Sequence, residues 1–206
     1  LAFDKHAAAL QIQSGAVEAG FAALCELAAT GEIDLWGDAM FAALEHKRSD
    51  LAAEAMRGAE AWVNRTYAGQ LDSPEAKRDQ GYVAFLKARL AVAQGNVAEG
   101  LAWFEFAAAL DEFYRQHPQY LYIHLIDAGA YPEAISLIKG NEQNTARAGF
   151  WRGLAYYRSG QLAEAGRLWK RVADQPVPDD ESVDFLELVL TRYYLGDHEG
   201  IGLASV

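Results

Sequence analysis

Residues 150–178 constrain the fold of this chain most strongly, because they hold two helical patterns separated by a Ser-Gly pair at 159–160. Apolar residues recur at spacings of three and four on both sides of that pair, namely Phe150, Leu154 and Tyr157 before it and Leu162, Ala165, Trp169 and Val172 after it. This periodicity predicts two amphipathic helices, each with one apolar face. Two short helices joined by a glycine turn form a helical hairpin that cannot bury both faces by itself. We therefore expect similar hairpins beside this one.

Turn residues in similar contexts recur along the chain. They are Gly15, Gly95, Gly129, Gly160 and Gly196, and Ser49 takes the equivalent place in the remaining hairpin. The intervals between successive turns are 34, 46, 34, 31 and 36 residues. Self-similarity at a nearly fixed period is typical of repeat proteins. We interpret the chain as an array of about six helical hairpins.

The residues around these turns resemble the tetratricopeptide repeat (TPR) family, whose unit is a helix–turn–helix of 34 residues. In that pattern a small residue lies seven positions before the turn and an aromatic residue four before it. An alanine follows five positions after the turn, a large apolar residue nine after and a small residue twelve after. The best match surrounds Gly160 and consists of Gly153, Tyr156, Ala165 and Trp169, with Val172 in the last place. The match around Ser49 is poorer, with Glu54 where alanine is expected. The resemblance implies an all-α fold, an α-solenoid in which antiparallel hairpins wind into a right-handed superhelix.

The hairpins are expected to form one TPR-like domain over residues 1–206. Their approximate ranges are 3–30, 35–65, 74–114, 118–139, 147–174 and 181–206. In the third hairpin, Ser73 followed by Pro74 favours a helix start, and its two helices are expected over 74–94 and 97–114. Acidic residues at 179–181 are expected to begin the sixth hairpin, whose second helix would start near residue 198. Because that helix is cut short and the chain lacks an initial methionine, we expect a fragment of a longer protein.

The composition disfavours several kinds of partner. The net charge of −11 results from 18 Lys and Arg against 29 Asp and Glu, whereas binding to nucleic acid or to an anionic membrane surface requires basic residues. No apolar run approaches the roughly 18 residues of a membrane span, so we expect no direct membrane insertion. Cys25 is the only cysteine, which excludes an internal disulfide, and we expect it to be a buried, inert thiol. A cytoplasmic location is favoured, and a periplasmic one stays open.

No catalytic or metal-binding motif is present. The sequence has no HExxH, P-loop, GxSxG or GxGxxG pattern, and its histidines are scattered over different hairpins. The acidic cluster over 174–184 is explained by the preference of helix N-termini for acidic residues. We therefore predict no enzymatic activity, no cofactor and no metal. An enzyme with carboxylates converging from separate helices stays a third hypothesis, which no pattern supports.

The first helix of each hairpin carries an unusual set of side chains. Positions 13, 10, 9, 6, 3 and 2 before each turn would face or flank the inner groove of such an array. In six hairpins these positions hold nine aromatic residues, where an aromatic content of 12% over 36 positions gives about four. The aromatic residues are Trp36, Tyr82, Phe85, Tyr120, Phe150, Trp151, Tyr157, Tyr193 and Tyr194. The basic residues are Lys5, Lys47, Arg89, Arg147 and Arg158, against the acidic residues Asp127 and Glu187.

The leading functional hypothesis is a non-catalytic scaffold that binds a peptide or protein segment in this groove. The expected contact residues are Tyr82, Phe85, Arg89, Tyr120, Arg147, Trp151, Tyr157 and Arg158. Aromatic anchors would supply the affinity, and the arginines would select an acidic or carboxylate-bearing ligand. A competing interpretation is that several of these aromatic residues pack between neighbouring hairpins. The alternative function is self-association, or structural bracing within a larger multidomain protein, because exposed aromatic patches serve assembly equally well.

Overall fold

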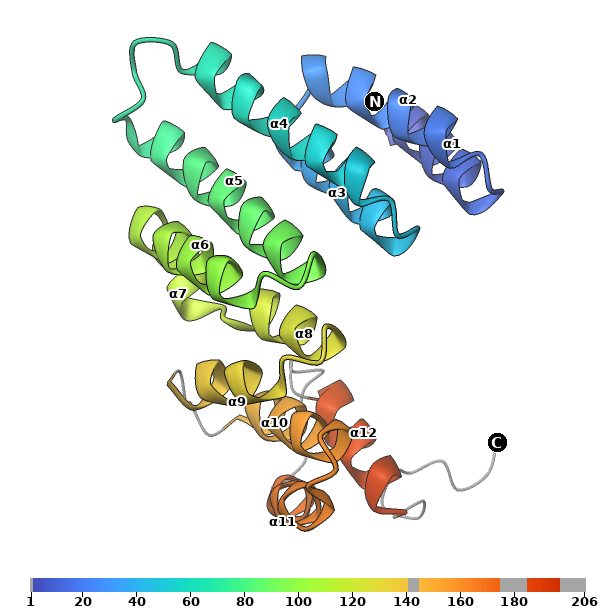
Figure 1. Ribbon diagram of the computed structural model, residues 1–206, viewed down its shortest axis with the longest axis vertical. Helices are drawn as coiled ribbons and strands as arrows, with labels where there is room; N and C mark the ends of the chain where they lie inside the picture. The colour runs from blue at the N-terminus through green and yellow to red at the C-terminus, as the bar shows by residue number, and fades with distance from the viewer. Residues whose placement is uncertain (1, 141–144, 175–184, 197–206) are drawn as a thin grey trace. The chain divides into compact units, whose positions relative to one another are not determined.

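The computed structural model describes residues 2–140, 145–174 and 185–196, and Figure 1 shows that they are mainly helical. These residues form twelve α-helices and no β-strand, which confirms the predicted all-α class. The helices pack in neighbouring pairs and fall into two compact units, residues 1–116 and residues 117–206. The helix start predicted at 179–181 and the second helix of the sixth hairpin lie outside the described residues. The single continuous repeat domain stays a prediction.

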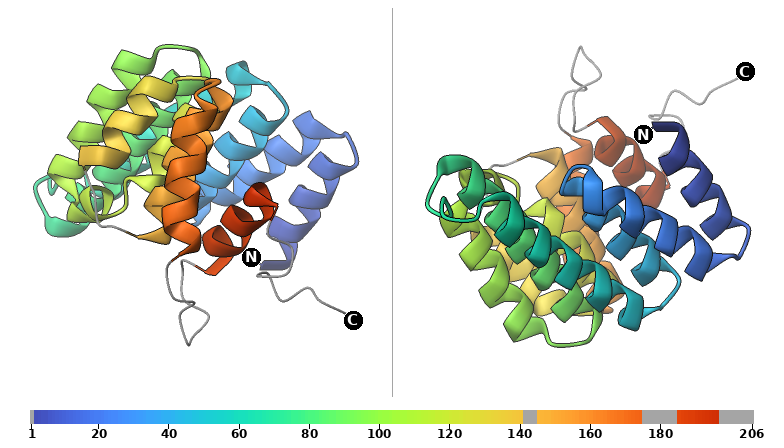
Figure 2. Two further views of the ribbon diagram at one scale, coloured as in Figure 1. Left: turned by 90° about the horizontal axis from the view of Figure 1, so that it is seen from below. Right: turned by 90° about the horizontal axis from the view of Figure 1, so that it is seen from above.

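The first unit consists of three helix pairs and a short final helix. It contains α1 (Ala2–Gln13), α2 (Val17–Thr30), α3 (Asp34–Glu45), α4 (Ser49–Thr66), α5 (Pro74–Ala93), α6 (Val97–Leu110) and α7 (Glu112–Gln116). The pairs are α1 with α2, α3 with α4 and α5 with α6, and α2 contacts α3 as α4 contacts α5. Helices of one pair lie side by side in the views of Figure 2. Each pair therefore buries its apolar face partly within itself and partly against its neighbour.

The second unit has the same kind of packing. It contains α8 (Gln119–Asp127), α9 (Tyr131–Gly140), α10 (Ala146–Arg158), α11 (Leu162–Ala173) and α12 (Phe185–Leu195). α8 pairs with α9 and α10 pairs with α11, while α12 packs against both α10 and α11. Leu121, Leu125 and Ile138 are almost fully buried in the first pair. A cluster of Ala146, Val172 and Leu188 joins α10, α11 and α12.

Five helix pairs are closed by one kind of turn. The turn residues with positive φ are Gly15, Lys47, Gly95, Gly129 and Gly160. In each turn this residue donates its N–H to the carbonyl three positions earlier, and the next residue donates to the carbonyl five positions earlier, with N···O distances of 2.8 to 3.1 Å. These two hydrogen bonds define a Schellman motif, which satisfies carbonyl groups at the helix end. The repeated turn predicted from the glycines is thus a repeated hydrogen-bonding arrangement.

The prediction that Ser49 is the second turn residue is wrong. Ser49 is the first residue of α4, and the left-handed position belongs to Lys47, whose φ is 57°. Lys47 donates to the carbonyl of Leu44 and Arg48 donates to that of Ala43, both at 2.9 Å. The left-handed region favours glycine, so a search based on small turn residues passes over a lysine there. All positions counted from this turn shift by two residues.

The corrected turn improves the repeat pattern of the second pair. Five residues after Lys47 comes Ala52, and twelve after it comes Ala59, and both are fully buried. When the positions are counted from Ser49, Glu54 takes the place five residues after the turn, although it is exposed on α4. Alanine at both positions lets α4 approach its neighbours closely, since a larger side chain would not fit in the buried space.

Small residues hold the two helices of a pair close together. A Cβ built at Gly20 would lie 2.5 Å from Cγ1 of Ile12, and one built at Gly100 would lie 2.6 Å from Cγ2 of Val92. Both glycines follow their turn by five positions, and both apolar partners precede it by three. Ala165 occupies the same position in α11 and is buried. The small residue and the turn together fix how the second helix packs on the first.

The predicted start of the long fifth helix is confirmed. The Ser73 hydroxyl accepts a hydrogen bond from the Ala76 N–H at 3.2 Å, and Pro74 is the first residue of α5. The preceding loop is also attached to α5, because the Tyr67 hydroxyl donates to the buried carboxylate of Asp79 at 2.7 Å. The loop that lengthens this interval of the repeat is therefore held to the helix that follows it.

The sixth helix is shorter than expected, because it ends at Leu110 instead of continuing to residue 114. Asp111 has an extended backbone, and its carboxylate accepts a hydrogen bond from the Phe113 N–H at 2.9 Å. An aspartate that bonds nearby backbone in this way competes with helix formation. The break places Tyr114 of α7 in a stack with Phe85, with ring centroids 5.2 Å apart.

Substitution of Lys47 by glycine should stabilise the protein. A left-handed conformation costs an L-residue about 1–2 kcal/mol, and glycine avoids this cost. Glycine also has more conformational freedom in the unfolded chain, which reduces the gain in stability by about 0.5–1 kcal/mol. We expect Lys47→Gly to raise the free energy of unfolding by about 0.5–1 kcal/mol in denaturant titrations. Gly95→Ala is the matched control, because an added Cβ would meet nothing within 4 Å. Gly95→Ala should lower the free energy of unfolding. If Lys47→Gly also lowered it, the assignment of Lys47 as the turn residue would be contradicted.

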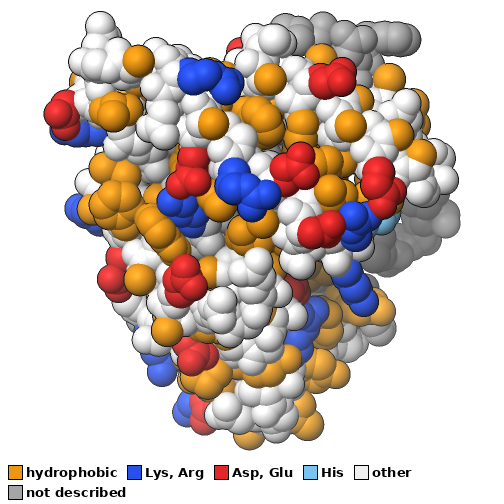
Figure 3. Space-filling model, turned by 45° about the horizontal axis from the view of Figure 1, so that its top comes forward, with side chains coloured by type: hydrophobic (Ala, Val, Ile, Leu, Met, Phe, Trp, Pro, Cys, Tyr) orange, Lys and Arg blue, Asp and Glu red, His pale blue; other side chains and the backbone are white. Residues whose placement is uncertain are grey.

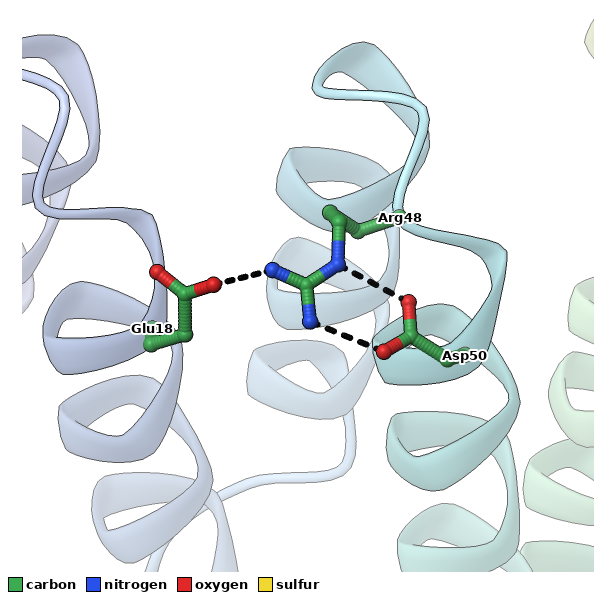
Figure 4. A network of polar contacts seen from close by, with 3 residues as sticks. All are labelled: Glu18, Arg48 and Asp50. Atoms are coloured by element: carbon green, nitrogen blue, oxygen red, sulfur yellow. Dashed lines mark hydrogen bonds and ion pairs between the residues drawn. The ribbon is translucent and has the colours of Figure 1, made fainter.

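An arginine next to the corrected turn connects two helix pairs, as Figure 4 shows. Arg48 forms a bidentate contact with Asp50 of α4, with N···O distances of 3.0 and 2.8 Å, and its remaining Nη contacts Glu18 of α2. Hydrogen bonds from Arg48 lower the pKa of Asp50 to about 2. The pKa of Glu18 is also lowered, first by a backbone hydrogen bond and then by Arg48. Arg48 therefore holds the α1–α2 pair to the start of α4.

The contribution of Arg48 should depend on pH. A carboxylate with a lowered pKa stabilises the folded state above its ordinary pKa, and that stability is lost as the pH falls toward 2. We expect Arg48→Gln to lower the melting temperature at pH 7 and to have a much smaller effect near pH 2 or in about 1 M salt. Arg57→Gln, which removes an exposed charge from α4, is the control. An equal loss of melting temperature for Arg48→Gln at both pH values would contradict the bridge.

Candidate functional site

The eight predicted contact residues are divided between the two units. Tyr82, Phe85 and Arg89 lie on one side of α5 in the first unit, and the other five lie in the second. In the first unit they lie opposite residues of α3 that the corrected turn brings into the pattern. We define the α3–α5 face as Asp34, Gly37, Asp38, Phe41 and Glu45 of α3 with Tyr82, Phe85 and Arg89 of α5.

Tyr82 lies directly against the backbone of α3. A Cβ built at Gly37 would be 1.8 Å from the Tyr82 hydroxyl, so the absence of a side chain there makes room for the ring. Burial raises the pKa of the Tyr82 hydroxyl, and the nearby carboxylates of Asp34 and Asp38 raise it further. Tyr82 thus remains a neutral phenol, half-buried between a glycine and two acidic side chains.

Arg89 lies over aromatic rings instead of forming an ion pair. Its guanidinium carbon is 3.5 Å from the ring centroid of Phe41 and 5.9 Å from that of Phe85. Among the described residues no carboxylate forms an ion pair with it, and its Nε is buried without a hydrogen-bond acceptor. Burial lowers the pKa of Arg89 to about 10, although Tyr82 and Glu45 oppose that shift. Arg89 therefore remains charged at neutral pH. Burial costs it desolvation free energy, and the cation–π contacts with the rings offset about 0.5–2 kcal/mol of that cost.

Acidic side chains flank this face. With Lys47 as the turn residue, the inner positions of α3 include Asp34, Asp38 and Glu45, and they no longer include Lys47 itself. Asp38 pairs with Lys5 of α1. The pKa of Asp34 is raised by partial burial and then by nearby acids. Counted from Ser49, the inner positions of the second hairpin include no acidic residue, and this part of the prediction is wrong.

Trp36 also leaves the predicted groove. Its exposed fraction is 8%, and a Cβ built at Gly58 of α4 would lie 2.1 Å from the Trp36 ring. The ring therefore packs between the two helices of its own pair. Trp36 is thus a packing residue, but it packs within its own hairpin and not, as the competing interpretation expected, between neighbouring hairpins.

Two of the predicted arginines in the second unit already have acidic partners. The Arg147 Nε is 3.1 Å from a carboxylate oxygen of Glu187 on α12, and Arg158 Nη1 is 2.9 Å from a carboxylate oxygen of Asp127 on α8. These ion pairs join α10 to the helices on either side of it. They reduce the capacity of both arginines to select an acidic ligand.

The aromatic residues of the second unit form a continuous cluster. Phe150 is buried and stacks on Trp169, whose indole N–H donates to the Phe150 carbonyl at 3.1 Å. Tyr194 stacks on the same indole with ring centroids 4.9 Å apart, and Tyr157 lies 5.6 Å from it. Tyr157, Tyr193 and Tyr194 retain exposed fractions of 46%, 59% and 45%. Buried rings thus support an exposed group of tyrosines at one end of α10 and α12.

The remaining two predicted residues differ in exposure. Tyr120, at the start of α8, is exposed and lies 6.3 Å from the ring of His117. Trp151 is half-buried, and its ring lies 5.3 Å from Phe150 and 6.4 Å from Tyr122. Tyr120 is therefore exposed at the surface, whereas Trp151 is mainly a packing residue.

The sequence interpretation missed Phe41, which supports Arg89. Phe41 lies six residues before the true turn at Lys47, so the two-residue error moved it out of the pattern. A basic segment, His46-Lys47-Arg48, marks the helix end and could have indicated the turn, since basic residues favour helix C-termini.

Neither the surface charges nor the Cys25 thiol indicates a further functional site. On the face of the molecule in Figure 3, basic and acidic side chains are interspersed with hydrophobic ones. Cys25 is half-buried, and burial raises the pKa of its thiol to about 12, with a smaller effect from Glu54. Across residues 2–140, 145–174 and 185–196, no group of three or more His, Cys, Asp or Glu side chains is arranged to hold a metal ion.

No model of a known protein family matches the chain, and no curated protein matches it significantly. In the part of the chain that the structure describes, no helix combines the length and the apolar character needed to cross a membrane. A functional proposal therefore depends on the geometry of the described residues.

The contact between Gly37 and Tyr82 can be measured with a double-mutant cycle. Alanine is a better helix former than glycine by about 1 kcal/mol, but a methyl group at position 37 would displace the Tyr82 ring. We expect Gly37→Ala to stabilise a Tyr82→Ala variant by about 0.5–1 kcal/mol and not to stabilise the wild type. Equal effects of Gly37→Ala in both backgrounds would show that the two residues do not touch.

Proposed function

We propose that this chain is a non-catalytic interaction module similar to tetratricopeptide repeats. Support comes from the five identical turns and from small buried residues at equivalent positions after them. The proposal extends to the architecture: helix pairs that stack in sequence would form an α-solenoid, a right-handed superhelix of about six hairpins. Such arrays present the first helix of each pair toward a partner.

The α3–α5 face is proposed to contact a segment of a partner protein. The observation that carries the proposal is Arg89, a half-buried arginine stacked on Phe41 that has no ion-pair partner among the described residues. Arginines and aromatic residues in such settings dominate the energetics of many protein interfaces. The aromatic rings fix the plane of the guanidinium, so little side-chain entropy would be lost when a partner binds.

The proposed partner group is an oxygen acceptor. Arg89 carries terminal N–H groups that can donate to a carboxylate or to a backbone carbonyl. The acids Asp34 and Glu45 on the same face, and the ion pairs of Arg147 and Arg158, weigh against a strongly acidic partner. We therefore propose a segment of low net charge that places one acceptor at Arg89 and apolar side chains beside Tyr82.

Assembly is the second candidate function, because one observation favours it. The exposed tyrosines of the second unit adjoin Leu195, which is also exposed. A patch of this kind can be covered by a second copy of the chain or by another domain of a longer protein. Sedimentation velocity over a range of concentrations distinguishes self-association from a monomer that binds a different protein.

Loss of Arg89 should abolish binding selectively. The immobilised protein would be used to capture partners from a lysate of its source cells, with quantification by mass spectrometry. We expect Arg89→Glu to lose the partner and Arg89→Lys to weaken its capture, because lysine keeps the charge but not the planar stack. Arg158→Glu is the matched control, since that arginine is already paired with Asp127. Unchanged capture by a folded Arg89→Glu variant, or equal loss in the control, would contradict the proposal.

A further inference from the structure

A concave surface lies on the other side of α5 from Tyr82 and Arg89. Its floor is formed by residues 80, 83, 84 and 87, which share one helical stripe about half a turn away from residues 82, 85 and 89. α5 contacts both α4 and α6 and separates them, so their side chains form the two walls. We define the α5 groove by Glu60 and Asn64 of α4, Val83 and Lys87 of α5, and Trp103 and Phe106 of α6.

The charges inside the α5 groove neutralise each other. The Lys87 ammonium lies 2.5 Å from a carboxylate oxygen of Glu60 and 4.2 Å from the ring centroid of Trp103. An ion entering the groove would have to compete with a partner that is already in place, and it would gain little from a neutral pair. The groove therefore favours an uncharged occupant.

The walls of the α5 groove provide an aromatic corner. Trp103 and Phe106 meet edge to face, with ring centroids 6.0 Å apart and an angle of 75° between their planes. Phe106 is half exposed although it is a large apolar residue. A third ring placed in this corner could pack edge to face against one of them, an arrangement that aromatic rings prefer.

The size of the α5 groove corresponds to a single ring. Its volume is about 160 Å³, close to the roughly 150 Å³ of an apolar cavity that holds benzene. Asn64 at the rim is exposed and offers both an amide donor and an acceptor. These groups match the backbone on either side of one inserted side chain.

We propose that the α5 groove binds one uncharged aromatic side chain of a partner protein. The ring would pack against Trp103 and Phe106, and the adjoining peptide backbone would bond to Asn64. This site uses none of the residues of the α3–α5 face. Its success or failure is therefore independent of the function proposed above.

The test is an NMR titration with N-acetyl-L-phenylalaninamide as the probe. The indole N–H resonance of Trp103, assigned by its loss in Trp103→Phe, should shift in a saturable manner, and N-acetyl-L-alaninamide should not shift it. Phe106→Ala should weaken probe binding at least about fivefold. Phe113→Ala is the control, because Phe113 is a similarly exposed phenylalanine outside the groove.

Three outcomes would overturn the proposal. The first is the absence of a saturable shift at Trp103 up to the solubility limit of the probe. The second is an equal loss of binding in Phe113→Ala and Phe106→Ala. The third is tighter binding of the charged amides of N-acetyl-L-lysine or N-acetyl-L-glutamate, which would show that the Lys87–Glu60 pair opens to select an ion.

Discussion

The left-handed residue between paired helices is the constraint on which the rest of this structure depends. It ends the first helix, satisfies two of its carbonyl groups and reverses the chain within three residues. The second helix then begins at a fixed distance, so a small residue five positions later always faces the first helix. Because each pair is too short to bury its apolar face alone, this fixed geometry also determines which side remains for the neighbouring pair.

The sequence was sufficient for those parts of the fold that depend on local chemistry. Glycine spacing indicated four of the five described turns, and the Ser73-Pro74 pair indicated the start of α5. It failed where an ordinary residue adopts an uncommon conformation, as Lys47 does, or where one side chain ends a helix early, as Asp111 does. Neither the turn at Lys47 nor the helix end at Asp111 changes the spacing of the apolar residues, and the helices were predicted from that spacing.

The candidate site was predictable only in part, because its chemistry depends on contacts between helices. Helical periodicity placed Tyr82, Phe85 and Arg89 on one side of α5, as the structure has them. Periodicity cannot reveal that Arg147 and Glu187, or Arg158 and Asp127, form ion pairs across 40 and 31 residues of sequence. Of the three predicted arginines, Arg89 is then the one without an ion pair among the described residues, although Glu45 lies near it. The proposed partner is therefore a segment of low charge instead of an acidic one.

The backbone conformation at Lys47 decides which residues of α3 belong to the α3–α5 face, because their positions are counted from Lys47. An NMR measurement of the intraresidue NOE between the amide and α protons is sensitive to the sign of φ. A left-handed Lys47 should give a strong NOE, comparable with those of residues in left-handed turns, and a helical Ser49 should give a weak one. A helical Lys47 with a left-handed Ser49 would restore the register counted from Ser49. It would remove Phe41 from the face and contradict the site built around Arg89.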